Sequence, residues 1–63
     1  MTLTNNNNEF ATIINEGEYG FKVLFGYSTP SFEAYGNETV TGRKTFKAEK
    51  TAISKAKKYL GVN

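Results

Sequence analysis

Apolar residues in the last third of the chain recur with the period of a helix that is buried on one side only. Ala52, Ala56 and Leu60 stand four positions apart, so at about 100° per residue they share one face of a helix. Ile53 falls on the same arc. The opposite arc is rich in lysine and holds Lys47, Lys50, Lys55, Lys57 and Lys58. The pattern predicts a basic amphipathic helix whose apolar face packs against the rest of the domain.

The C-terminal end of this helix is marked in the sequence. Gly61 follows the last apolar position, where a glycine adopts the left-handed conformation that closes a helix, and Val62 can supply the apolar contact of such a cap. The helix is therefore predicted to end near Leu60. Its start stays open between two registers, with either Thr45 or Ala48 as the capping residue.

Length and composition restrict the chemistry that the chain can perform. It has 63 residues, with no cysteine and no histidine. A chain of this length forms one domain near the lower limit at which an apolar core is stable without disulfides or a metal. The lack of thiol and imidazole groups removes the usual metal ligands and nucleophile–base pairs. We therefore expect a protein that is not an enzyme and that binds no metal and no cofactor.

The N-terminal region shows no targeting signal. It lacks the basic and apolar regions of a signal peptide, and no stretch approaches the ~20 apolar residues of a membrane span. We expect a cytoplasmic protein without a membrane partner. Residues 1–8 include four consecutive asparagines and have no apolar period, so we predict a disordered tail there and a single domain over residues 9–63.

The middle of the chain is rich in strand-forming residues. Strands are predicted at residues 9–15, 19–27 and 38–46. Pro30 interrupts the chain after the second of these, and residues 31–35 are either a further short strand or an irregular excursion. The prediction is an α+β domain, in which an antiparallel β-meander of three to four strands carries one C-terminal helix packed on one face.

Side-chain alternation in the second strand predicts which residues face the helix. Phe21, Val23 and Phe25 share one face, which sends Lys22 and Leu24 to the other. The predicted core comprises Phe10, Ile14, Phe21, Val23, Phe25, Phe32, Val40, Phe46, Ala52, Ile53, Ala56 and Leu60. Ile13 is expected to lie with Leu24 on the face that the helix leaves open.

Charge is distributed unevenly along the chain. Residues 1–42 hold one lysine and five glutamates, a net charge of −4, whereas residues 43–63 hold seven cationic side chains and one glutamate, a net charge of +6. Such asymmetry favours an anionic partner, although a lysine-rich helix face is also the ordinary way to keep a small protein in solution. The predicted contacts to nucleic acid are Arg43, Lys44, Lys47, Lys50, Lys57 and Lys58. DNA and RNA both fit this pattern.

A second hypothesis assigns function to the open face of the sheet or to its edge strand. The residues expected at a protein-interaction surface are Ile13, Lys22, Leu24, Tyr27 and Tyr35. A protein partner, in the manner of small accessory or inhibitor proteins of phages and mobile elements, or a second copy of the chain would bind there. The tyrosines also suit base stacking, which would assist a nucleic-acid surface.

The segment from residue 38 to residue 60 has a strand ending in Lys44-Thr45-Phe46 that leads into a helix starting with Glu49-Lys50-Thr51-Ala52. This layout resembles the three-stranded domains with one helix at the N-termini of some phage-type integrases. It is also similar to the second half of double-stranded RNA-binding domains and to small bacterial β-β-β-α domains. The first helix and the lysine pair of the RNA-binding fold are missing, so the resemblance implies topology only.

Overall fold

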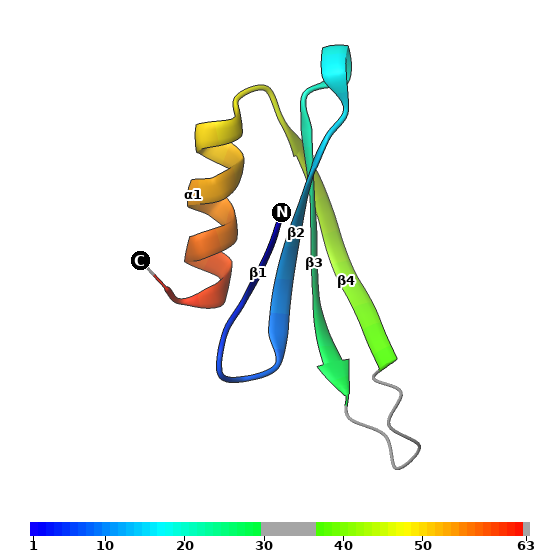
Figure 1. The fold of residues 1–63 in the computed structure, drawn as a ribbon, viewed down its shortest axis with the longest axis vertical. Helices are drawn as coiled ribbons and strands as arrows, with labels where there is room; N and C mark the ends of the chain where they lie inside the picture. Colours follow the sequence, from blue (N-terminus) through cyan, green and yellow to red (C-terminus); the bar gives the residue numbers. More distant parts are fainter. Residues whose placement is uncertain (30–36, 63) are drawn as a thin grey trace.

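Four strands form one antiparallel sheet in the order of the chain, and helix α1 lies across one of its faces (Figure 1). The computed structural model describes residues 1–29 and 37–62. The elements are β1 (Thr2–Thr4), β2 (Glu9–Asn15), the 3-10 helix η1 (Gly17–Tyr19), β3 (Phe21–Thr29), β4 (Asn37–Phe46) and α1 (Glu49–Leu60). This confirms the predicted α+β meander with a C-terminal helix. Phe32 and the proposed strand at 31–35 lie outside the described residues.

The core lies between α1 and the two central strands. Ala11 and Ile13 of β2 stand opposite Phe25 and Val23 of β3, so these side chains share the face below the helix. The buried cluster consists of Ala11, Ile13, Val23, Ala52, Ala56 and Leu60, with Leu3, Phe21, Phe25, Phe46 and Ile53 partly buried against it. Because the alanines are small, the helix axis approaches the sheet closely while the larger side chains fill the space around it.

The two faces of β2 are the reverse of the prediction. Ile13 is 7% exposed in the core, and Ile14, which was expected there, is 39% exposed. The register explains this, because Ile14 stands opposite Lys22 and therefore points away from α1. The prediction for Val40 was also wrong, since Val40 pairs with Gly26 on the same outer face and is 51% exposed. Phe10 is buried as predicted, but on this outer face.

Residues 1–8 were predicted to be disordered, and this was wrong. Thr2–Thr4 forms the edge strand β1, which pairs with β2. The asparagines build the connecting turn: the Asn5 Oδ1 accepts hydrogen bonds from the backbone N–H groups of Asn7 at 2.9 Å and Glu9 at 3.1 Å. Asn8 adopts a left-handed conformation with φ of 61°. The local hydrogen bonds of these asparagines therefore produce a turn.

Asn5 also connects this turn to the end of the helix. Its Nδ2 donates to the Leu60 carbonyl oxygen at 2.9 Å and to Glu9 Oε1 at 2.9 Å. The Leu60 carbonyl is one of the terminal helix carbonyls that have no partner within the helix. A side chain in the β1–β2 turn thus satisfies part of the C-terminus of α1.

The helix ends as the sequence predicted. Gly61 has φ of 71° and ψ of 24°, and its N–H donates to the Lys58 carbonyl at 3.3 Å while the Val62 N–H donates to the Lys57 carbonyl at 3.0 Å. These two bonds form a Schellman motif. At the other end Ala48 is the N-cap and provides no side-chain hydrogen bond.

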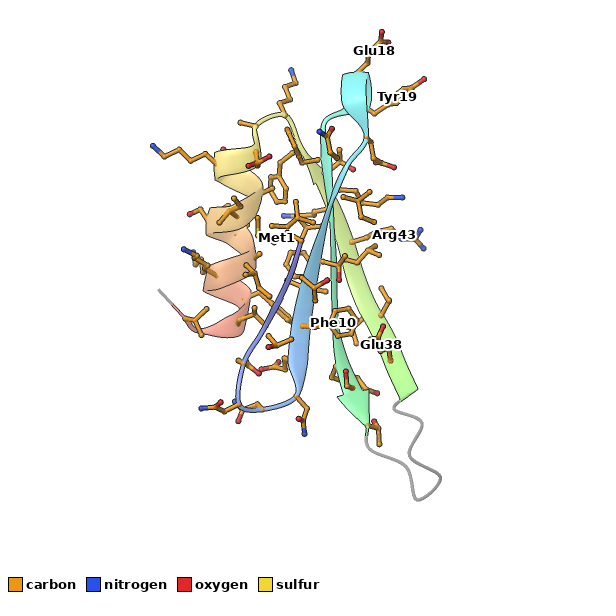
Figure 2. The ribbon with its side chains drawn as sticks, in the orientation of Figure 1. Met1, Phe10, Glu18, Tyr19, Glu38 and Arg43 are labelled. Carbon is orange, nitrogen blue, oxygen red and sulfur yellow. The ribbon has the colours of Figure 1, made fainter. Side chains whose placement is uncertain are left out.

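Gly26 of β3 pairs with Phe10 of β2 on one side and with Val40 of β4 on the other. The Phe10 ring, labelled in Figure 2, packs directly against it: a Cβ on Gly26 would lie 2.8 Å from the Phe10 Cζ and would overlap the Thr39 carbonyl oxygen. A shift of register follows, because Phe25 pairs with Gly42 and Gly26 pairs with Val40, which leaves Thr41 as an extra residue on β4. Gly26 therefore lets the bulge and the Phe10 ring fit at one point.

We predict that Gly26→Ala lowers the free energy of unfolding by about 1 to 3 kcal/mol, because the added methyl group overpacks the strand junction. Urea denaturation followed by circular dichroism measures the change. Gly42→Ala is the matched control, since no atom lies within 4 Å of a Cβ at that position. Equal stability of the Gly26 variant and the wild type would show that the junction is not closely packed.

We predict that Asn5→Ala lowers the free energy of unfolding by about 1 to 3 kcal/mol, because two backbone N–H groups and the Leu60 carbonyl lose their partner. Asn6→Ala is the control; Asn6 is exposed, and we expect a change within about 0.5 kcal/mol. Thermal unfolding of both variants provides the comparison. If the two substitutions have the same small effect, the turn does not hold the edge strand to the helix.

Candidate nucleic-acid interface

The outward side of α1 is formed by lysines. Burial of Ala52, Ala56 and Leu60 turns the opposite arc of the helix to solvent, where Lys50 and Lys58 are exposed. Lys55 is exposed on one flank of the helix, and Lys57 is half-buried on the other. The same repeat that packs the helix on the sheet therefore holds four lysines along its solvent side.

Two further lysines extend this surface toward the sheet. Lys44 of β4 pairs with Val23, which is buried beneath α1, so the Lys44 side chain leaves the sheet on its helix side. Lys44 is exposed there. Lys47 lies between β4 and α1 and is also exposed. We call the combined set the lysine face; it consists of Lys44, Lys47, Lys50, Lys55, Lys57 and Lys58.

The structure does not bring Arg43 to the lysine face. Arg43 pairs with Leu24, which in turn pairs with Thr12, and this row lies on the sheet face turned away from α1. Figure 2 shows the Arg43 side chain projecting from β4 on the side away from the helix. Neighbouring residues on a strand point to opposite faces, so Arg43 and Lys44 are separated although they are adjacent in sequence.

Within residues 1–29 and 37–62, no acidic side chain forms an ion pair with the lysine face. The one ion pair found in these residues joins Lys22 Nζ to Glu16 Oε2 at 3.6 Å, and both side chains are about one-third exposed. Glu18 projects from η1 at one end of the molecule, and Glu38 lies on β4 opposite Ser28, on the outer face (Figure 2). Glu49, in the first turn of α1, is the acidic residue closest in sequence to these lysines.

Two partly exposed tyrosines lie beside the C-terminal half of the helix. The Tyr59 ring packs against Phe25 with a centroid separation of 4.8 Å and an interplanar angle of 49°, and its hydroxyl donates to the Gly26 carbonyl at 3.5 Å. Tyr59 is 37% exposed and Tyr27, on the same side of the sheet, is 43% exposed. Tyr19 is 81% exposed on η1, far from this pair (Figure 2).

The residues predicted for a protein-interaction surface do not form one surface. Ile13 is in the core, and Tyr27 is on the helix side of the sheet. Tyr35 is outside the described residues. Lys22 and Leu24 do lie on the face turned away from α1. That open face includes Thr12, Ile14, Lys22, Leu24, Val40 and Arg43.

The described part of the chain has neither a metal-binding cluster nor a helix that could span a membrane. Residues 1–29 and 37–62 contain no group of three or more histidine, cysteine or acidic side chains able to hold a metal ion. Within those residues, α1 is too short and too polar to pass through a bilayer, and no other helix qualifies. The chain matches no protein-family model, no curated protein and no solved structure.

Proposed function

We propose that the protein is a small non-enzymatic module that binds nucleic acid through the phosphate groups of the backbone. The observation that supports this is the lysine face, whose six side chains lie on one side of the fold without an ion pair among the described residues. Lysines that are not neutralised by the protein itself remain available to phosphates. Their binding releases the cations condensed on the polyanion, which favours association.

The shape of the lysine face suits a polyanion better than a small anion. The lysines of the helix run from Lys50 to Lys58, which is about 12 Å along the axis at ~1.5 Å per residue. A small anion contacts only one or two such side chains at once. A nucleic-acid backbone presents charges along a comparable length, so several lysines bind simultaneously.

The geometry changes the set of residues that we assign to contact. Lys44, Lys47, Lys50, Lys57 and Lys58 stay in the proposed interface, and Lys55 joins them because it is exposed on the same helix. Arg43 leaves the interface because its strand position directs it to the other face of the sheet. A backbone bound along α1 does not reach it.

A second candidate function, as a protein-interaction module or homodimer, is favoured by the open face. Ile14 and Val40 are exposed there, and Leu24 is only partly buried. Exposed apolar side chains that stand singly are common on monomeric proteins, so this observation carries less weight than the grouped lysines. Binding to such a surface would tolerate salt and would be lost in Leu24→Asp.

We predict that the double variant Lys50→Gln, Lys58→Gln weakens binding to short DNA and RNA and makes it less dependent on salt. Two lost phosphate contacts lower the slope of log affinity against log salt by roughly 1.4 to 1.8. Fluorescence anisotropy with labelled single strands and duplexes between about 50 and 200 mM salt measures both quantities.

The matched control is the double variant Lys22→Gln, Arg43→Gln, which removes the same charge from the open face. We expect it to keep both the affinity and the slope of the wild type. Equal losses in the two double variants would indicate a nonspecific effect of net charge. A wild type that binds no oligonucleotide at about 50 mM salt would overturn the proposal and direct attention to the open face.

A further inference from the structure

Building on the proposed function, we propose that the lysine face takes single-stranded nucleic acid, with bases stacked on Tyr59 and Tyr27 while the lysines of α1 hold the phosphates. The proposal depends on three features of the structure: the order of three aromatic rings, the exposure of two of them, and the charges around them. Each is a property of the described residues on the helix side of the sheet.

The rings form a row that runs from α1 onto β3. The Tyr59 ring rests on Phe25 at 4.8 Å, and its hydroxyl is directed at the Gly26 backbone. Tyr27 follows Phe25 by two positions on the same strand, so its side chain leaves the same face about 7 Å further along. Tyr59, Phe25 and Tyr27 therefore follow one another across the surface beside the helix.

Tyr59 and Tyr27 are partly exposed, but Tyr59 is also fixed in place. Its 37% exposure accompanies a ring packed on Phe25, so stacking a base on it orders little that is not already ordered. Tyr27 is 43% exposed beside it. Stacking of a base on an aromatic side chain contributes about 1 to 3 kcal/mol and depends little on which base is present.

The charges around the row suit a backbone that passes along α1. Lys55 precedes Tyr59 by four positions, one helical turn, and therefore flanks its ring. Glu9 stands opposite Tyr27 across β2 and β3, and its carboxylate accepts a hydrogen bond at 2.9 Å from Asn5 Nδ2, which also donates to the Leu60 carbonyl at the end of α1. Phosphates are thus attracted by Lys55 and repelled by Glu9, which orients a bound strand.

This arrangement distinguishes a single strand from a duplex. The bases of a duplex are stacked on one another inside the helix, so their faces are not accessible to Tyr59 and Tyr27. A single strand offers both phosphates and free base faces. Lysines alone would bind both forms through phosphate charge, and the tyrosine row adds affinity only for the unpaired form.

The test is Tyr27→Leu, which keeps an apolar side chain but removes the aromatic face, with Tyr19→Leu on η1 as the control. Anisotropy with labelled oligo-dT, oligo-rU and a mixed-sequence duplex compares the wild type and the two variants at several salt concentrations between about 50 and 200 mM. We expect the wild type to prefer the single strands, and Tyr27→Leu to lose about tenfold in affinity for them with no change for the duplex. Tyr19→Leu should behave as the wild type, and the salt slope should be the same in all three.

Two outcomes would overturn the inference in different ways. Equal affinity for single strand and duplex, unchanged by Tyr27→Leu, would remove the stacking role and leave the lysine face as a phosphate site. No binding of any oligonucleotide would remove the proposed function as well.

Fluorescence of the wild type provides a second measurement in case Tyr27→Leu fails to fold. The chain has four tyrosines and no tryptophan, so its emission reports the tyrosines directly. Saturating oligo-dT should quench this emission, whereas the duplex should not. Equal quenching by both ligands, or none by either, would contradict stacking.

Discussion

The close packing of the two alanines of α1 on the central strands is the contact on which the rest of the structure depends. Ala52 and Ala56 are fully buried against a surface that includes Ala11 and Val23, which are also fully buried. Small side chains at this contact let the helix lie near the sheet, and the position of the helix then decides which sheet face is covered. It also decides which arc of the helix meets solvent, and so directs the lysines outward.

Features with a local period could be predicted from the sequence. The helix, its end at Gly61 and the alternation of Phe21, Val23 and Phe25 are all of this kind. Which face of β2 is buried could not be predicted, because apolar residues stand at both odd and even positions of this strand: Phe10, Ala11, Ile13 and Ile14. Only the pairing with β3 decides which of the two sets faces the helix, and this pairing is a long-range property. β1 could not be predicted for the same reason, because this three-residue strand is held by its pairing with β2 and by hydrogen bonds of Asn5.

The candidate site shows the same division between local and long-range information. The lysines of α1 were placed correctly on its outer arc because a helix fixes its own geometry. Arg43 and Lys44 both lie in the predicted strand 38–46, so alternation alone separates them, but which of the two faces the helix depends on the register of β4 and on the bulge beside Gly26. The contact between Tyr59 and Phe25 joins residues far apart in the chain, and it depends on how far the helix extends along β3. Spacing in the sequence carries no trace of it.

The lysines are not equally informative about function. Lys57 and Lys58 lie in the last turn of α1, where the negative end of the helix dipole stabilises a cation without any partner. Lys50 lies in the first turn and Lys47 just before it, where the dipole disfavours positive charge and Ala48 supplies no side-chain cap. Stability of the fold explains the lysines at the C-terminal end but opposes those at the N-terminal end. The placement of Lys47 and Lys50 is therefore the part of the charge pattern that most favours an anionic ligand.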